Sequence, residues 1–194
     1  MPDSLAPEDV VPRLRGSFGQ PYLFVESTPS TQLLLDADAP EGAVVTADEQ
    51  TAGRGRLGRR WLAPPGTSLL CSIQLRPTVV ASRLPELTGV ATRACAQAIE
   101  EVAGILPEVK FPNDLLVDSR KLAGILAEAR EGRVVLGVGV NVNIRATDLP
   151  LDVDKPATSL LLETGRKVDR ANLLVAVLDR LEATYREWLM PSGG

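Results

Sequence analysis

The sequence predicts an α+β fold in which helices cover one face of a mainly antiparallel mixed sheet. Three observations lead to this prediction. Two long segments space their apolar residues as a helix does, most other apolar runs are as short and β-branched as strands, and several of those runs are linked as hairpins. Strands and helices do not alternate regularly, so a doubly wound parallel sheet is not expected.

In the first half of the chain, apolar runs bounded by turn residues predict three strands, over 22–26, 43–46 and 68–75. Residues 1–20 contain prolines and show no periodicity, which indicates a loosely packed arm. After the first strand, Ser30 or Thr31 offers a hydroxyl N-cap ahead of three leucines, so a helix is expected to begin there.

In the second half, apolar residues recur at helical spacing over 84–105. Residues 109–128 then predict an extended stretch, a Pro-Asn-Asp turn and a β-hairpin whose turn lies near Ser119. Residues 133–143 (RVVLGVGVNVN) form a mostly apolar strand, which we expect to be buried on both faces. Asp169 is the predicted N-cap of a closing helix with one apolar stripe.

Length and composition indicate one soluble globular domain, with 194 residues of which 44% are hydrophobic and 24% charged. The net charge is −4, so the broad basic surface needed for general nucleic-acid binding is not expected. The chain has no histidine. This excludes Ser-His-Asp and Cys-His catalysis as well as zinc sites ligated by histidine.

The two cysteines, Cys71 and Cys95, lie in apolar stretches without metal-ligand spacing. They are expected to be reduced core residues. The N-terminus has no signal-peptide pattern, and no apolar run approaches the ~18 residues of a membrane span. We therefore expect a cytoplasmic protein with no membrane partner.

The most unusual segment is GRGRLGRRW, residues 53–61, with four arginines and three glycines in an acidic chain. Glycines weaken both helices and strands, and four like charges repel unless something negative lies among them. The segment therefore predicts a loop that folds around an anion. The alternative is a solvated basic loop that makes surface salt bridges.

Two nucleotide-binding motifs can be tested against this loop. Gly53, Gly55 and Gly58 match the dinucleotide fingerprint, which requires a following helix and an acidic residue about 20 positions on. Prolines follow instead, and no Asp or Glu occurs between Trp61 and Pro85, so the Rossmann interpretation is rejected. A P-loop is also absent, because no glycine precedes Lys-Ser or Lys-Thr.

Two further segments place polar residues beside apolar strands. Lys121 begins the KLAGIL run, where it would reach a phosphate, and Gly124 would let a ligand approach the backbone. A lysine whose stem packs at a hairpin end explains the pattern equally well. In GVGVNVN, Gly137 and Gly139 indicate close approach by a ligand or another backbone. Asn141 needs a hydrogen-bond partner there, and an amide satisfied by a neighbouring loop is the favoured interpretation.

Taken together, GRGRLGRRW, KFPND, KLAGILAE and GVGVNVN resemble, in order and spacing, the GRGRxGRxW, KWPND, KLAGIL and GxGxN motifs of the biotin–protein ligase family. PATSL, residues 156–160, is similar to a further family segment, and the resemblance covers roughly residues 22–190. It implies a class II aminoacyl-tRNA synthetase/biotin ligase-like catalytic domain. The implied activity is ATP-dependent formation of biotinyl-5'-AMP with release of pyrophosphate, followed by transfer of biotin to a lysine of a biotin carboxyl carrier protein.

The resemblance also implies roles for individual residues. The residues expected to bind biotin are Ser30, Thr31, Gln32, Gln50, Gly53, Arg54, Gly55, Arg56, Lys121 and Gly124. The residues expected to bind ATP are Arg56, Arg59, Trp61, Asn113, Asp114, Lys121 and Asn141. Catalysis is assigned to Arg56, Arg59 and Lys121, because a carboxylate that attacks a triphosphate needs cations rather than a general base. Mg²⁺ is expected to accompany ATP near Asp114, without a defined set of protein ligands.

The sequence departs from the family pattern at two positions: the family's Ser-Thr-Asn is Ser30-Thr31-Gln32 here, and Phe111 replaces the tryptophan of KWPND. The expected organisation is an N-terminal arm over 1–21 and a catalytic domain over 22–190. No N-terminal DNA-binding domain, and so no DNA partner, is expected, nor is a C-terminal SH3-like domain. Exposed edges of the 137–143 strand would let two subunits pair, so a homodimer is considered.

Two other functions stay open. One is a lipoate or octanoate ligase or transferase of the same fold, a class that lacks the GRGRxGR loop. The other is a non-catalytic module that binds anions or nucleic acid with the arginine loop as a passive clamp. The acidic composition argues against nucleic acid, and Lys121 with Asn113 and Asp114 would be surplus in a passive clamp.

Overall fold

The computed structural model describes residues 3–150 and 156–190, and its centre is a seven-stranded mixed sheet. The strand order is β1-β2-β3-β7-β6-β5-β4; β1 and β2 are parallel and every other neighbouring pair is antiparallel. The strands are β1 (Tyr22–Thr28), β2 (Val44–Gln50), β3 (Ser68–Leu75), β4 (Glu108–Lys110), β5 (Asp114–Val117), β6 (Arg120–Arg130) and β7 (Arg133–Asn141). The predicted fold class is confirmed.

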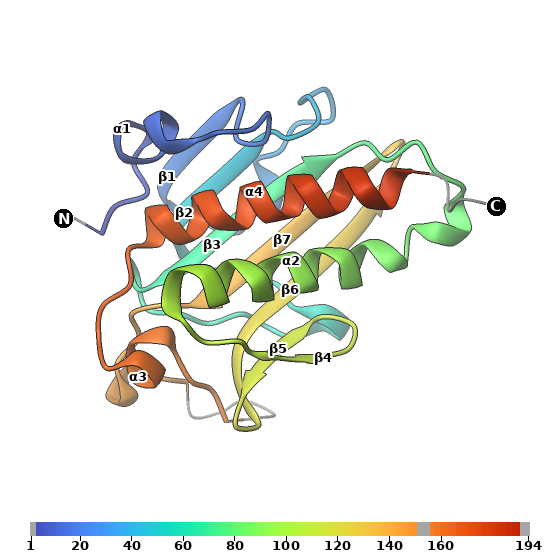
Figure 1. Cartoon of the computed structure of the whole chain (residues 1–194). Helices are drawn as coiled ribbons and strands as arrows, with labels where there is room; N and C mark the ends of the chain where they lie inside the picture. Colours follow the sequence, from blue (N-terminus) through green and yellow to red (C-terminus); the bar gives the residue numbers. More distant parts are fainter. Residues whose placement is uncertain (1–2, 151–155, 191–194) are drawn as a thin grey trace.

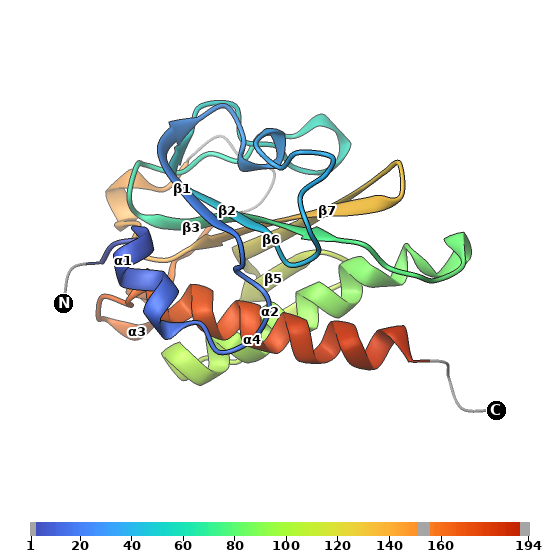
Figure 2. The same ribbon diagram turned by 90° about the horizontal axis from the view of Figure 1, so that it is seen from above.

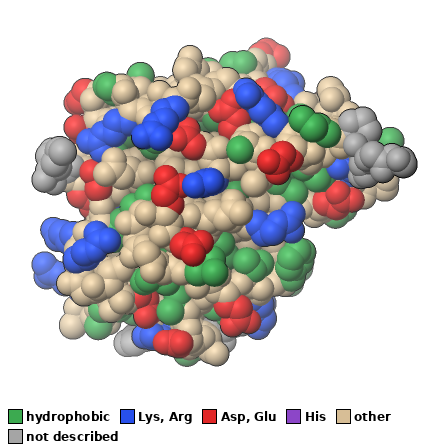
Figure 3. All heavy atoms as spheres, in the orientation of Figure 1, with side chains coloured by type: hydrophobic (Ala, Val, Ile, Leu, Met, Phe, Trp, Pro, Cys, Tyr) green, Lys and Arg blue, Asp and Glu red, His purple; other side chains and the backbone are tan. Residues whose placement is uncertain are grey.

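Two long helices, α2 (Glu86–Ala103) and α4 (Arg170–Leu189), lie side by side across one face of the sheet (Figures 1 and 2). Both were predicted. Small buried residues along α2, including Ala91, Ala94 and Ala98, let this helix pack closely against its neighbours. Acidic and basic side chains are interspersed over the outer surface of this helical layer (Figure 3).

The ends of these helices follow ordinary capping rules. α2 ends at Gly104, whose φ of 74° is the left-handed conformation that glycine adopts without a steric penalty. Asp169 caps α4 as predicted, because its side chain accepts a hydrogen bond from the Asn172 N–H. A short helix, α3 (Leu160–Thr164), is capped in the same way by Ser159.

Side-chain alternation along the strands divides the sheet into two different faces. In β3, Leu69, Cys71, Ile73 and Leu75 join the main hydrophobic core with α2 and α4. The alternate residues Ser68, Ser72 and Gln74 are also buried, but they are polar and point to the other side. That second face is covered by loops rather than by helices (Figure 2).

The predicted hairpin within residues 109–128 is confirmed as the turn between β5 and β6, where Asp118 and Ser119 adopt positive φ values of 47° and 64°. The expected helix at Ser30 is wrong. Only a 3₁₀ turn, Thr31–Leu33, forms there. Thr31 and Gln32 are buried and their side chains bond to other elements, and these tertiary hydrogen bonds compete with helix formation.

The N-terminal segment was expected to be loosely packed, and this is wrong for the residues from Asp3 onward. Leu5, Val10 and Phe18 belong to the main core, and α1 (Pro7–Val10) lies beside the start of α4 (Figure 1). The Tyr22 hydroxyl donates to the Leu5 carbonyl at 2.6 Å. The apolar residues that anchor this segment in the core are irregularly spaced, so hydrophobic periodicity did not predict its packing.

The 137–143 segment was also expected to offer an exposed strand edge for a homodimer. This is wrong, because β7 pairs with β3 on one side and β6 on the other. Its predicted burial on both faces is confirmed. The edges of the sheet are β1 and β4. A homodimer stays a prediction without this support.

Candidate active site

A pocket opens on the loop-covered face of the sheet, and it brings together side chains from every predicted motif. Its floor is formed by β3, β6 and β7. Its walls are formed by the turn of residues 30–32, the arginine loop (residues 53–61) and the turn before β5 that contains Asn113. Its lining residues are Ser30, Thr31, Gln32, Gln50, Arg54, Gly55, Arg56, Trp61, Cys71, Ser72, Asn113, Lys121, Gly124, Ile125, Leu126, Gly137, Val138 and Gly139. Gly53 and Arg59 line an adjoining cavity under the arginine loop.

The arginine loop is a small hairpin rather than an irregular coil. Arg54 and Arg60 form an antiparallel bridge, the Gly55 N–H donates to the Arg59 carbonyl at 2.8 Å, and the Trp61 N–H donates to the Gly53 carbonyl at 2.9 Å. At its tip, Gly58 has a φ of 75°. This left-handed conformation explains one of the three glycines.

The arginines of this hairpin point to different partners, which lowers their mutual repulsion. Arg54 forms an ion pair with Glu128 of β6 at 2.8 Å, and Arg56 donates to the Asn113 side-chain oxygen at 2.8 Å. A carboxylate of β6 therefore lies against the loop and offsets part of the repulsion among its like charges. Arg56 and Asn113, both predicted to bind ATP, lie in direct contact.

The floor of the pocket is a patch of glycines under an indole ring. Gly124 of β6 and Gly139 of β7 are cross-strand partners, and the Trp61 ring lies over both. A Cβ added at Gly139 would lie 2.8 Å from this ring, and one at Gly124 would lie 3.1 Å from it. The predicted close approach is thus made in the structure by a side chain of the same protein.

The 30–32 turn is held against the sheet by hydrogen bonds. The Gln50 side-chain oxygen accepts from the Thr31 N–H at 2.8 Å, and the Thr31 hydroxyl lies 2.7 Å from that of Ser72. Gln32, at the family's Asn position, donates to the Leu126 carbonyl at 3.3 Å. It fits because Gly137 has no side chain; a Cβ there would lie 2.8 Å from the Gln32 amide nitrogen.

Lys121, the first pocket residue of β6, is the basic group nearest the glycine floor. Its ammonium group pairs with Asp114 at 2.8 Å and lies 5.7 Å from the centre of the Trp61 ring. Asn113 also donates to Asp114, at 2.9 Å. Asp114 does not line the pocket itself but fixes two side chains that do. This arrangement presents a cation to the pocket beside its glycine floor.

Two buried polar atoms of the pocket have no hydrogen-bond partner within the described part of the chain: the Gln32 side-chain oxygen and the Trp61 indole nitrogen. A buried polar group without a partner costs about 1–3 kcal/mol. The pocket therefore offers one unused acceptor and one unused donor to a ligand.

Asn141 lies outside the pocket lining, although the resemblance assigned it to ATP. Its amide donates to the Thr158 carbonyl at 2.9 Å and to the Lys121 carbonyl at 3.4 Å. Asn141 thus ties the PATSL segment to the start of β6. This matches the simpler interpretation of an amide satisfied by a neighbouring loop.

Several lining residues were missed by sequence reasoning: Ser72, Ile125 and Leu126. For Ser72 a signal exists, since three of the four residues that alternate with the core residues of β3 are polar (Ser68, Ser72 and Gln74, with Leu70 the exception), which marks a face that is not core. Cys71 also borders the pocket, although its side chain joins the main core. Burial raises the pKa of its thiol well above the usual range, and the nearby Cys95 raises this pKa further. Both cysteines are buried and free, as predicted.

Residues 3–150 and 156–190 contain neither a cluster of metal ligands nor a membrane-spanning helix. No group of three or more His, Cys, Asp or Glu side chains that could hold a metal ion occurs there. Within these ranges, no helix has the length and apolar character needed to cross a membrane.

The fold and the pocket motifs define the class of protein. Residues 24–144 match the Biotin/lipoate A/B protein ligase family. Because this match covers more than half of the chain, the protein belongs to that family.

Individual relatives narrow the resemblance further. The chain is 41% identical to the bifunctional ligase/repressor BirA of Bacillus subtilis over 180 residues, covering 88% of this chain and 55% of that protein. It is 38% identical to the biotin–[acetyl-CoA-carboxylase] ligase of Mycobacterium tuberculosis, covering 84% and 64% respectively. The chain thus spans about half to two thirds of the length of these relatives.

Solved structures show the same fold. The biotin protein ligase from Aquifex aeolicus in complex with biotin and ATP matches with a TM-score of 0.78 and 34% identity, over 85% of this chain and 70% of that one.

Proposed function

We propose that this protein is a biotin–protein ligase that makes biotinyl-5'-AMP from biotin and ATP and transfers the biotin to a lysine of a biotin carboxyl carrier protein. The observation that carries the proposal is the pocket itself: Arg56, Asn113 and Lys121 converge on a glycine floor. The names of two relatives support this proposal: the one in Mycobacterium tuberculosis is a biotin–[acetyl-CoA-carboxylase] ligase, and the one in Bacillus subtilis is a ligase/repressor.

In the first step, the carboxylate of biotin attacks the α-phosphorus of ATP, and the bond to the pyrophosphate leaving group breaks. The carboxylate is already ionised at neutral pH, so no base is required and the absence of histidine is no handicap. The obstacle is repulsion between two anions. Lys121, Arg56 and Arg59 lower this barrier by neutralising charge where it accumulates.

The orientation of biotin follows from the unused polar groups of the pocket. The Gln32 side-chain oxygen would accept from a ring N–H of the ureido group, which places the carboxylate toward Lys121 at the other end of the pocket. Ser30, Thr31 and Gln50 complete this wall, while Gly53, Arg54, Gly55 and Gly124 provide backbone and cationic contacts. Trp61 would shift from the glycine floor as the ligand enters.

In the second step, the neutral amine of the acceptor lysine attacks the acyl carbon of the mixed anhydride, the amide bond forms and AMP leaves. The amine loses a proton in this step, and Asp114, beside Lys121, is the proposed acceptor. The arginine hairpin would order over the intermediate and keep water from hydrolysing it. The carrier protein is the partner that this step requires. Asn141 contributes indirectly, by holding the 156–158 segment beside Lys121.

Mg²⁺ is retained as part of the proposal. Mg²⁺ is commonly bound through one or two carboxylates together with substrate phosphates, and Asp114, which is paired with Lys121 at the edge of the pocket lining, would be the protein carboxylate nearest to such an ion. When bound, the ion would neutralise phosphate charge. We also propose a cytoplasmic location, which suits the two free buried cysteines.

The alternative within the family is activation of lipoate or octanoate. The arginine hairpin and the biotin ligases among the relatives favour biotin. A passive anion clamp is disfavoured because Lys121 and Asn113 meet the arginine loop inside one pocket.

The deciding experiment incubates the purified chain with ATP and either biotin or lipoate, and measures pyrophosphate release and bound acyl-adenylate. Release with biotin, together with retained biotinyl-AMP, is expected. Release with lipoate alone would transfer the assignment to that branch of the family, and release with neither would refute a ligase.

A further inference from the structure

The arginine loop leaves the sheet at a point where two strands separate. Pairing between β2 and β3 ends at Ala47 and Leu70, and the chain between them forms the loop. One backbone hydrogen bond joins its two stems near the sheet, from the Gly66 N–H to the Asp48 carbonyl at 3.0 Å. The entry stem also pairs with β1 as far as Gln50, and Ser68 pairs with Asn141 of β7, so each stem is held by its own neighbour while few contacts join the two stems to each other.

Arg170, the first residue of α4, bridges these two stems. Its side chain is 3% exposed, and one guanidinium nitrogen donates both to the Asp48 carboxylate at 2.8 Å and to the Ser68 carbonyl at 3.3 Å. Asp48 lies on the strand that enters the loop and Ser68 on the strand that leaves it. A single buried cation thus ties both ends of the loop to one helix.

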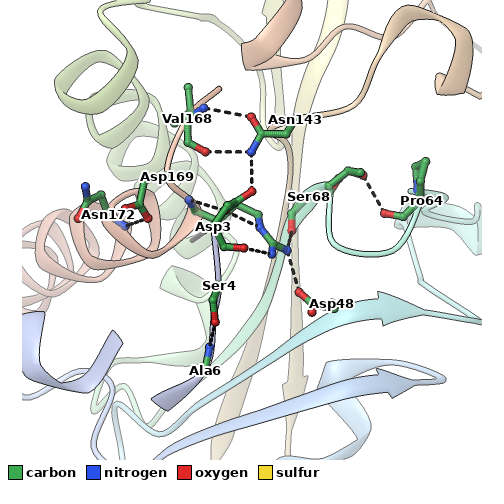
Figure 4. Close-up of polar contacts among 12 residues, drawn as sticks. Asp3, Ser4, Ala6, Asp48, Pro64, Ser68, Asn143, Val168, Asp169 and Asn172 are labelled. Atoms are coloured by element: carbon green, nitrogen blue, oxygen red, sulfur yellow. Dashed lines mark hydrogen bonds and ion pairs between the residues drawn. The ribbon is translucent and has the colours of Figure 1, made fainter. Parts of the chain in front are cut away.

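The other side of the guanidinium is fixed by Asp3. The Asp3 carboxylate accepts from the Arg170 side chain at 2.9 Å and from its backbone N–H at 3.1 Å, and the Asp3 carbonyl accepts at 2.9 Å. Figure 4 shows Asp3 between Asn143 on one side and Asp48 and Ser68 on the other. The planar fork of arginine makes this multiple contact directional.

Asn143 extends the same network to the exit stem. Its amide donates to the Asp3 carboxylate at 2.7 Å, and its backbone N–H donates to the Thr67 carbonyl at 2.7 Å. Asn143 belongs to the GVGVNVN motif but lies outside the pocket lining. The network therefore contacts the stems of the loop at three residues: Asp48 on the entry stem, and Thr67 and Ser68 on the exit stem.

We propose that Arg170 is a positioning residue for the ligase reaction: by clamping Asp48 and Ser68 it sets how the arginine loop leaves the sheet. This inference rests on the proposed function for its catalytic consequence. Gln50, which holds Thr31 in the pocket, lies two residues beyond Asp48 on the same strand. A released stem disturbs both this wall and the loop that retains the acyl-adenylate.

The main test uses Asp48→Ala, which removes the contact to the entry stem and leaves the pair between Arg170 and Asp3 intact. Asp48→Asn is the conservative variant, since its side-chain oxygen still accepts a hydrogen bond. Glu101→Ala is the matched control. It removes a carboxylate from Arg180, which lies on the same helix and contacts Glu101 at 2.7 Å, away from the loop.

The first measurement is tryptic cleavage within residues 54–60 of the ligand-free full chain, at a temperature well below unfolding. Local opening sets the rate of such cleavage, so Asp48→Ala is expected to be cut about fivefold faster than wild type. Asp48→Asn should stay near wild type, as should Glu101→Ala. Equal cleavage of Asp48→Ala and Glu101→Ala would overturn the proposal, whether or not the protein is a ligase.

The second measurement is the ratio of biotinyl-AMP lost to solution to biotin transferred to the carrier. Asp48→Ala is expected to raise this ratio severalfold while Asp48→Asn restores it. A fall in turnover with an unchanged ratio in Asp48→Ala would refute positioning. If wild type makes no adenylate, the proposed function fails, and the cleavage assay still decides whether the clamp exists.

Discussion

The two faces of the sheet are built from the same strands but differ in almost every property. On the helix-covered face, β7 contributes Leu136, Val138 and Val140 to a continuous aliphatic core. On the loop-covered face, the alternate residues Gly137 and Gly139 form the floor of the pocket. The comparison shows that one strand serves stability and binding at once, because successive side chains point to opposite faces.

Buried polar groups differ between the faces in the same way. On the helical side, Glu182 of α4 accepts hydrogen bonds from the Ser17 N–H, the Ser17 hydroxyl and the Phe18 N–H. In the pocket, the Gln32 oxygen and the Trp61 nitrogen are buried without a partner in the described residues. The Ser68 hydroxyl, outside the pocket lining, is also buried without a partner, so it is the place of the Gln32 and Trp61 atoms in the pocket that makes them available to a ligand.

The largest expected effect is on the pocket side. Lys121→Ala removes the cation beside the glycine floor and should lower the rate of biotin-dependent pyrophosphate release by roughly 100-fold or more, because charge stabilisation is the main catalytic device. Circular dichroism should show an unchanged fold. The control is Arg120→Ala on the same strand, whose guanidinium pairs with Glu163 instead. Full activity of Lys121→Ala would refute the role of this lysine.

On the helix side, Leu136→Ala should lower the free energy of unfolding by about 2–5 kcal/mol, since it leaves a cavity in a fully buried position. The KM for biotin of the folded fraction should stay as in wild type. Denaturant titration and steady-state kinetics measure the two quantities. A large rise in KM without loss of stability would contradict the separation of the two faces.

Gly139→Ala, three residues further along β7, is the reciprocal change. Its new Cβ would collide with the Trp61 ring and narrow the pocket, so the KM for biotin should rise about tenfold. The loss of stability should stay near 1 kcal/mol, because the ring faces a pocket and can move. If Gly139→Ala and Leu136→Ala change the free energy of unfolding and the KM for biotin to the same extent, the two faces do not have separate roles in binding and stability.

The smallest effect concerns pH and Glu182. Burial alone would raise the pKa of this carboxyl, but hydrogen bonds from Ser17 and Phe18 together with nearby positive charge outweigh it. Its pKa therefore lies below the usual 4.5, so its ionised form stabilises the fold above that pH. The stabilisation is lost as the pH falls through the lowered pKa of the folded state.

Glu182→Gln should accordingly show a shallower fall in melting temperature below pH 4.5 than wild type does. Melting curves between pH 3 and pH 7 are the measurement. Parallel curves for the two proteins would show that this carboxyl does not contribute to acid sensitivity.

The sequence predicted those parts of the site whose functional residues lie in one continuous segment. The arginine loop, the Asn113 turn and Lys121 could each be singled out from residue types and spacing, and all line the pocket. Strand order is different, because it depends on pairing between distant segments. Nothing local indicates that β7 inserts between β3 and β6 rather than at an edge.

Other residues were missed for related reasons. Ser72 and Leu126 enter the pocket through their register with neighbouring strands, which the sequence alone does not define. Arg170 was not singled out at all, because its partners include Asp3 and Asp48, more than 100 positions away. Thr31 failed as a helix start because its hydroxyl bonds to Gln50 and Ser72 instead.

The glycine floor has a consequence for the entropy of binding. Gly124, Gly137 and Gly139 have no rotamers to lose, so a ligand that settles on them restricts no side chain beneath it. The strands under it are already fixed by ladder hydrogen bonds on both sides. On the protein side, the entropy lost on binding therefore comes mainly from the side chains above the glycines, which are Trp61 and the long arginines of the loop. How rigid these side chains are before binding then tunes the affinity for the ligand.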